Sequence, residues 1–120
     1  METLIEIIKR EDQSVIIFDF TGELDETNAD KSFKNISQQI GDFSNKKILF
    51  NLSWLEYLNS KSIGYIAGVF SNLDKNNGEM YISNCNQGVK NVLDDVGLTT
   101  IIPTVDEESE AVDALMLSMI

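Results

Sequence analysis

Two serine hydroxyls near the middle of the chain have the best placement for chemistry. The segment Asn59-Ser60-Lys61-Ser62 lies between an apolar run that ends at Phe50 and a segment whose apolar residues recur every three or four positions. A hydroxyl at the start of a helix is the usual sign of an N-cap. The other possibility is that one of the serines is a regulatory switch, and the segment by itself leaves both interpretations open.

The residue types that the chain lacks exclude several kinds of active site. The sequence contains no histidine, which removes the Ser-His and Cys-His arrangements that activate a nucleophile. With Cys85 as its single cysteine, it offers no zinc ligand set. No glycine-rich phosphate loop is present, and Asp19 and Asp25 lack the clustered acids and the later lysine of a Mg²⁺-dependent phosphoacceptor pocket. We therefore expect a protein that is not an enzyme and that has no cofactor or metal site.

Size and composition indicate a single domain that spans residues 1–120. Of the 120 residues, 42% are hydrophobic and 24% are charged, which is ordinary for a globular domain. The chain contains no apolar run of the ~20 residues needed to cross a bilayer, and its N-terminus lacks the basic start and apolar core of a signal peptide. A lone cysteine fits a reducing compartment, so we expect a cytoplasmic protein without membrane insertion.

The net charge limits the partners that the chain can bind. It is −11, with only nine Lys and Arg residues, so direct binding to nucleic acid or to anionic lipid is not expected. An acidic surface suits a protein partner with a basic face. The sequence does not fix the oligomeric state, for which we expect a monomer or a weak dimer.

Runs of β-branched and aromatic residues predict an opening hairpin. Leu4–Ile8 and Val15–Phe20 are separated by polar residues, and the second run is the more continuously apolar, so it should be the more central strand. Gly22 is expected to end that strand. Thr27-x-x-Asp30 then has the spacing of a capping box, and it predicts a helix that stops at Gly41.

Strand-like and helical patterns alternate through the rest of the chain. In order, they predict a strand at 46–51, a helix from Ser60 to the stop signal at Asn76–Gly78, and a strand at 80–82. A helix is then expected after Asn86, with Val89, Val92, Leu93 and Val96 on its buried face. A short edge strand at 101–105 precedes a last helix, which begins with the acids of 106–110 and buries Ala111, Leu115 and Met119. Gly64 and Gly68 lie four residues apart in the helix after Ser60. Close packing against the sheet is the first explanation for these glycines, and an exposed contact surface is the second.

This element order predicts an α/β fold with a mixed, mostly parallel sheet, an N-terminal antiparallel hairpin and about four helices. Loops that follow the carboxyl ends of parallel strands usually carry the functional groups. Three loops are placed in this way, at 22–27, 51–60 and 84–87. Trp54 and Tyr57 belong to the second loop, where they are expected either at an interface or partly buried over the edge of the core.

Three segments resemble the signatures of STAS domains, which are shared by sulfate transporters and bacterial anti-sigma-factor antagonists. Gly22–Asp25, followed by Asn28-Ala29, resembles the first signature. Asn51–Gly64 resembles the central signature, in which an Asp-Ser pair opens the second helix. Val96–Pro103, followed by an acidic helix start, is similar to the C-terminal part. The resemblance covers essentially the whole chain in the right order.

The resemblance implies a single compact STAS-like domain that acts by partner switching. In the antagonist branch, an anti-sigma factor that is also a serine kinase phosphorylates the first serine of the second helix, and only the unphosphorylated antagonist binds it. A serine phosphatase resets the cycle. By position, the acceptor here is Ser60. The implied partner-binding residues are Asp25, Asn59, Ser60, Lys61, Ser62 and Gly64.

Asn59 is the main departure from the family pattern, which usually has aspartate before the acceptor. Asparagine keeps the size and capping ability of aspartate but loses its charge. Phosphorylation could then be slower, absent or redirected to Ser62. The alternative function is therefore a STAS binding subunit of a transporter complex or signalling scaffold that is never phosphorylated.

Overall fold

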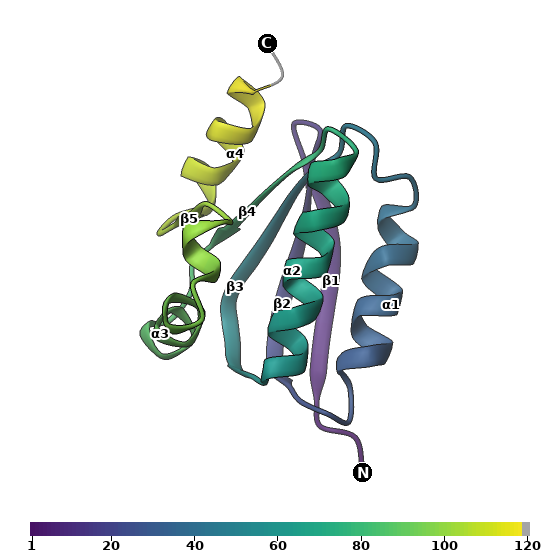
Figure 1. The fold of residues 1–120 in the computed structure, drawn as a ribbon, viewed down its shortest axis with the longest axis vertical. Coiled ribbons are helices and arrows are strands. Elements are labelled where there is room, and N and C mark those ends of the chain that lie inside the picture. The colour runs from purple at the N-terminus through teal and green to yellow at the C-terminus, as the bar shows by residue number, and fades with distance from the viewer. Residues whose placement is uncertain (119–120) are drawn as a thin grey trace.

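The sheet of this protein places its five strands in chain order, from β1 to β5 (Figure 1). The computed structural model describes residues 1–118. Antiparallel pairing joins β1 to β2, and the other neighbours pair in parallel. The strands are β1 (Ile5–Asp12), β2 (Val15–Leu24), β3 (Lys47–Leu58), β4 (Glu79–Ser83) and β5 (Thr104–Val105). The predicted α/β class, with its N-terminal hairpin and mostly parallel sheet, is confirmed.

Four α-helices in the described residues cover the two faces of the sheet unequally. They are α1 (Ala29–Ile40), α2 (Ser60–Lys75), α3 (Gln87–Asp95) and α4 (Glu108–Leu117), with a short 3₁₀ turn, η1 (Leu98–Thr100), after α3. Helices α1, α2 and α3 pack on one face, called here the front face, and α4 packs alone on the other, the back face. Alternation along β2 supplies both cores, because Ile16 and Phe18 point forward while Val15 and Ile17 point back.

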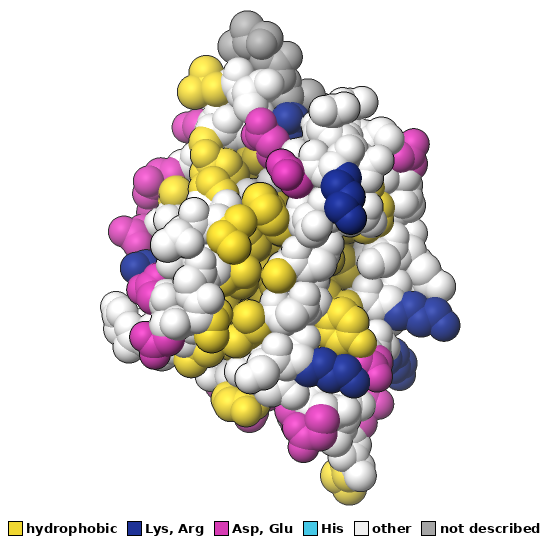
Figure 2. Space-filling model, viewed as in Figure 1, with side chains coloured by type: hydrophobic (Ala, Val, Ile, Leu, Met, Phe, Trp, Pro, Cys, Tyr) yellow, Lys and Arg dark blue, Asp and Glu magenta, His cyan; other side chains and the backbone are white. Residues whose placement is uncertain are grey.

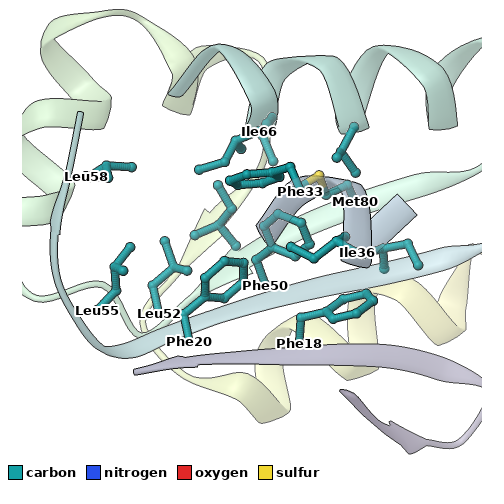
Figure 3. Packing of buried hydrophobic residues seen from close by; sticks show 14 of the residues in the cluster. Phe18, Phe20, Phe33, Ile36, Phe50, Leu52, Leu55, Leu58, Ile66 and Met80 are labelled. Atoms are coloured by element: carbon teal, nitrogen blue, oxygen red, sulfur yellow. The ribbon is translucent and has the colours of Figure 1, made fainter. Parts of the chain in front are cut away.

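Aromatic rings fill the centre of the front core (Figure 3). The rings of Phe18 and Phe50 meet edge to face with centroids 5.8 Å apart, and those of Phe20 and Phe50 lie 5.0 Å apart. Phe33 of α1 approaches Phe20 at 6.4 Å and so links the helix layer to the sheet. These edge-to-face and tilted contacts are the favoured arrangements of aromatic rings, and they fix α1 over the two central strands.

Strands β2 and β3 are longer than the sequence patterns predict. The expected loop at 51–60 is wrong for most of its length, since β3 continues to Leu58. Two irregularities in the β2–β3 register, between Asp19 and Thr21 and between Gly22 and Glu23, insert extra residues into β3. Because the bulges break strict alternation, the polar residues of this stretch read as a loop although they belong to a paired strand.

Gly22 lies inside β2 and does not end it, which corrects the prediction. Its φ of +118° is outside the range that side chains tolerate. A Cβ atom there would also lie 2.4 Å from the backbone oxygen of Leu4. Glycine therefore allows the start of β1 to approach the bulged part of β2.

Several local expectations are also corrected. The capping box at Thr27 does not form, because Asn28 precedes α1 and the Asp30 side chain turns to Lys61 of α2. In α3, Val92 and Val96 are exposed, although the sequence pattern predicted both on the buried face. The helix is short and packs through Val89 and Leu93. The edge strand is reduced to β5, with 101–102 in the turn before it. Met119 lies outside the described residues.

A polar cluster ties α4 to the hairpin. Arg10 of β1 donates from Nη1 to Glu108 Oε2 at 3.0 Å and from Nη2 to Asp19 Oδ1 at 2.9 Å. Asn51 Nδ2 donates to Glu108 Oε1 at 2.9 Å. The hydrogen bonds from Arg10, the larger effect, and from Asn51 hold the pKa of Glu108 below its usual range. Glu108 is the first residue of α4, so this cluster lies at the end of the part of the back face that α4 covers.

Replacing Gly22 with alanine tests the close approach of β1 to β2. We expect Gly22→Ala to lower the free energy of unfolding by about 2–4 kcal/mol, because it combines backbone strain with a steric clash. Gly64→Ala is the control: the Cβ meets open space in α2, so a gain of about 0.5–1 kcal/mol is expected. Urea denaturation of both variants measures the difference. Equal effects of the two substitutions would contradict the assignment.

The Glu108 contacts predict a pH-dependent stability. Because folding lowers the pKa of Glu108, the carboxylate stabilises the fold above its unfolded pKa, near 4.5, and this contribution is lost as the pH falls through the lower folded pKa. Glu108→Gln should therefore be less stable than the wild type at neutral pH, with the difference shrinking in acid. Asp113→Asn, which removes an exposed charge from the middle of the same helix, is the control and should change stability at neutral pH less than Glu108→Gln does. Thermal unfolding between pH 3 and pH 7 checks this.

Candidate functional site

The adjacent ends of β2 and β3 bring the candidate residues together at one edge of the sheet. Leu24 at the end of β2 is the register partner of Leu58 at the end of β3. Beyond this pair, the Asn59 N–H group donates to the Leu24 carbonyl oxygen at 3.1 Å. The loop that carries Asp25 therefore lies directly beside the start of α2, as the order of parallel strands predicts.

Asn59, and not a serine, is the N-cap of α2. Its backbone is extended, and its Oδ1 accepts from the Ser62 N–H at 2.9 Å and from the Ser62 hydroxyl at 2.7 Å. This is the usual capping interaction with the third residue of the helix, strengthened by the added hydroxyl donor. Because the cap is supplied by Asn59, the hydroxyl of Ser60 is not needed to start the helix.

The two serines have opposite environments. Ser60 is the first residue of α2 and is exposed, whereas Ser62 has no exposed surface and gives its hydroxyl hydrogen to Asn59. Ser62, which the sequence offered as the alternative acceptor, is therefore buried. Residues two apart at a helix start point in different directions, so one faces the solvent and the other faces the sheet.

Lys61 and Gly64 lie on the exposed part of α2. Lys61 Nζ is 2.8 Å from Asp30 Oδ1 of α1, and the Tyr65 hydroxyl donates to the same carboxylate oxygen. The hydrogen bond from Lys61, followed by that from Tyr65, lowers the pKa of Asp30. Asp30 and Tyr65 were not among the predicted site residues, and only the packing of α1 against α2 reveals them.

The carboxylate of Asp25 accepts hydrogen bonds from its own loop and from the N-terminal segment. It accepts from the Thr27 hydroxyl at 2.6 Å, from the Thr27 N–H at 2.9 Å and from the Thr3 hydroxyl. The bonds from Thr27, and then from Thr3, hold the pKa of Asp25 below its usual range. Beside it, the buried Asn28 donates to the backbone oxygens of Thr3 and Glu23. The loop that borders Ser60 is therefore held in one shape by side chains.

Apolar side chains extend from this end of α2 across the front of the molecule. Ile63, Ala67 and Phe70 of α2 are only partly buried, and Ile101 beyond α3 is exposed. Figure 2 shows hydrophobic side chains gathered between α2 and the α3–η1 segment. We call these four residues the front patch. At its far end, a hollow of about 310 Å³ is lined by Phe70, Ile101 and Pro103 among others.

The glycines of α2 are explained by exposure and not by packing. A Cβ at Gly64 or Gly68 would have no atom of another segment within 4 Å, so the expected close packing against the sheet is wrong. The two glycines instead flatten the exposed side of α2, between the front patch and Tyr65. Gly68 also borders a hollow of about 300 Å³ between α1 and α2.

The described residues also bear on two kinds of chemistry, that of a metal site and that of a reactive thiol. They hold no group of three His, Cys, Asp or Glu side chains placed to bind a metal ion. Burial raises the pKa of the Cys85 thiol to about 11, which keeps it protonated at neutral pH. Within 1–118, no helix combines the length and apolar character needed to span a membrane. At this edge, the hydroxyl of Ser60 is exposed at the first position of α2, and the Thr27 hydroxyl of the neighbouring loop is bonded to Asp25.

Residues 6–111 match the family model of the STAS domain, and the chain belongs to this family. Among curated proteins, it is similar to an anti-sigma F factor antagonist from Paenibacillus polymyxa, with 29% identity over 86% of this chain and 88% of that protein.

Solved structures share the fold. An anti-sigma factor antagonist from Mycobacterium paratuberculosis superposes with a TM-score of 0.83 at 19% identity, over 94% of this chain and 95% of that one. The Bacillus cell fate determinant SpoIIAA in its phosphorylated form gives a TM-score of 0.66 at 20% identity, over 91% and 98% of the two chains. At these identities, the similarity establishes the fold.

The capping assignment predicts which side chains at this edge carry stability. Asn59→Ala should cost about 1–2 kcal/mol of unfolding free energy, because it removes the cap and leaves the buried Ser62 hydroxyl without its acceptor. Asn59→Asp keeps an acceptor in place and should cost less than about 0.5 kcal/mol. Ser60→Ala is the matched control and should be nearly neutral. A loss from Ser60→Ala as large as that from Asn59→Ala in chemical denaturation would show that the cap is misassigned.

Proposed function

We propose that this protein is an anti-sigma factor antagonist that binds its anti-sigma factor when Ser60 is unmodified and is released when Ser60 is phosphorylated. The observation that carries the proposal is the contrast between the two serines. Ser60 is exposed at the first position of α2, while Asn59 caps the helix and the Ser62 hydroxyl is buried. A kinase can reach Ser60 without opening the fold, whereas Ser62 is accessible only if the cap is broken.

The relatives support this function. The curated relative is named as an antagonist of anti-sigma factor F, and it aligns along most of both chains. The structure of SpoIIAA was solved in a phosphorylated form, so a protein of this fold accepts the modification. By analogy, the partners proposed here are an anti-sigma factor that is also a serine kinase, and a serine phosphatase that reverses the reaction. The protein itself is proposed to be non-enzymatic and cytoplasmic.

The local electrostatics explain how a phosphate could act on the partner and spare the fold. Phosphorylation of Ser60 adds ~1.5 to 2 negative charges at the amino end of α2, where the helix dipole favours them. Lys61 is the next residue and is exposed, so it can pair with the new group in place of Asp30. A docked partner gains no such compensation and loses affinity through desolvation and steric conflict.

The proposed docking surface is the edge around Ser60 together with the front patch. It comprises Asp25 of the ordered loop, Asn59, Lys61, Ser62 as the buried support of the cap, and the open face of Gly64. The front patch begins at Ile63, one position before Gly64, and provides the apolar contact area that a stable association needs. The charged and apolar parts therefore adjoin Ser60, where a phosphate would disturb both.

The alternative, a STAS subunit of a transporter or scaffold that is never phosphorylated, shares the fold and the binding surface. Asn59 in place of aspartate is the residue that favours it. The structure shows that Asn59 fulfils the capping role through its amide oxygen, so the substitution has a structural explanation. The two functions differ in whether a kinase modifies Ser60.

Phosphorylation of purified variants tests the proposal. With the cognate anti-sigma factor and ATP, wild-type protein and Ser62→Ala should incorporate phosphate at Ser60, as located by mass spectrometry, and Ser60→Ala should incorporate none. Asn59→Asp should be modified at least as fast as the wild type. Ser60→Asp should weaken binding to the anti-sigma factor by about tenfold or more, equivalent to ~1.4 kcal/mol.

The outcomes separate the two functions. Binding to the anti-sigma factor without modification of Ser60 would support a non-phosphorylated binding protein. Absence of both binding and modification would remove the antagonist function. Phosphate found on Ser62 would contradict the structural assignment of the two serines, and circular dichroism of each variant confirms that the fold is intact.

A further inference from the structure

The back face of the sheet exposes large apolar side chains where α4 does not reach. Trp54 and Tyr57 of β3 are 72% and 50% exposed, and Ile8 of β1 is 51% exposed. We call these three residues the back patch. Exposed apolar side chains that cluster on a folded surface are uncommon unless a partner covers them.

The strand register places the back patch on one surface. In the β1–β2 pair, Ile8 lies opposite Asp19. In the β2–β3 pair, Trp54 lies beside Thr21 and Tyr57 beside Glu23. Paired residues share a face, and the odd-numbered residues of β2 point to the back, so all three side chains are on the face opposite to α2.

Helix α4 leaves this part of the sheet uncovered. Its apolar residues pack on Val15, Ile17 and Leu49, and Figure 1 shows α4 beside β4 and β5, away from the ends of β2 and β3 that lead to α1 and α2. The Arg10–Glu108 pair lies at the limit of the area that α4 covers on the back face. Beyond this limit, the bulges of β3 place Trp54 on the back face, and all three side chains of the back patch are at least half exposed.

A hollow beside Trp54 could hold a side chain of a partner. It has a volume of about 270 Å³ and is lined by Arg10, Asp19, Phe20, Asn51, Ser53 and Trp54. The guanidinium of Arg10 is already bonded to both Asp19 and Glu108. The two carboxylates therefore outweigh the one cation at this end of the patch.

The rest of the back patch is also acidic. Register places Glu6 of β1 beside Thr21, and Glu23 beside Tyr57. Both glutamates are exposed. The aromatic side chains are thus bordered by carboxylates at both ends, and the surface is complementary to a cationic partner group that has an apolar or planar surface.

We propose that the back patch is a second docking site, which binds an arginine-bearing segment of a partner protein. The guanidinium would stack on the Trp54 indole and face the nearby carboxylates. Arginine fits better than lysine, because its planar, weakly hydrated group stacks on aromatic rings. A second copy of this chain is disfavoured, since it would bring the same carboxylates and a net charge of −11 against them.

This site is independent of the proposed switch. It lies on the opposite face of the sheet from α2, and its residues are outside the front patch. A partner could therefore remain bound at the back patch while Ser60 is modified, which would allow one molecule to be tethered and switched separately. The site does not depend on whether Ser60 is phosphorylated.

The single tryptophan of the chain reports directly on the proposed contact. We expect a nona-arginine peptide, titrated at low ionic strength, to change the emission of Trp54 in a saturable way. Nona-lysine should bind at least about threefold more weakly. The double variant Glu6→Gln/Glu23→Gln should weaken nona-arginine binding about fivefold or more, which corresponds to ~1 kcal/mol.

Matched controls separate a site from general attraction to an acidic protein. Glu110→Gln/Asp113→Asn removes the same charge from exposed positions of α4 and should change affinity by less than about twofold. By calorimetry, Trp54→Ala should bind more weakly, and Ser60→Ala should bind like the wild type. Equal weakening by the two double variants, or unchanged Trp54 emission, would overturn the proposal, whatever the result of the kinase assay.

Discussion

The long parallel pairing of β2 with β3 is the constraint on which the other features depend. It runs from Ile16–Ile48 to Leu24–Leu58 and survives two bulges. Its final pair sets the loop of Asp25 beside the start of α2, and the hydrogen bond from the Asn59 N–H to the Leu24 carbonyl oxygen extends this pairing by one residue. The bulges also rotate the side chains of β3, which leaves leucines in the front core and aromatic residues on the back.

Unequal covering of the sheet then divides the surface into two regions. Three helices bury the front face, and the front patch remains partly exposed between α2 and the α3–η1 segment (Figure 2). On the back, one short helix covers only part of the strands. The result is a small acidic domain with exposed or partly buried apolar side chains on both faces.

The cap of α2 divides the roles of the side chains at the start of this helix. The Asn59 side-chain oxygen accepts hydrogen bonds from both the N–H and the hydroxyl of Ser62, so the Ser60 hydroxyl is not needed to cap the helix. A charge added at Ser60 meets a favourable dipole and a nearby lysine, and its effect on stability is therefore small compared with its effect on a docked partner. In the proposed function, the side chain that stabilises the helix start, Asn59, and the side chain that is modified, Ser60, are therefore neighbours that can be changed separately.

The sequence by itself determined the order of the elements and the opening hairpin, because apolar periodicity and turn residues are local signals. The family was indicated separately, by the resemblance of three segments to STAS signatures. The sequence also located Ser60 at the start of α2. The family signature favoured Ser60 over Ser62 as the acceptor, but the sequence did not show that Ser60 is exposed and Ser62 buried, since this difference arises from the Asn59 cap and from packing against the sheet. The sequence pattern also read residues 51–58 as a loop, whereas pairing with β2, a contact distant in sequence, makes them a strand. The tertiary structure decided these points because both depend on which segment packs against which, and local patterns do not encode that.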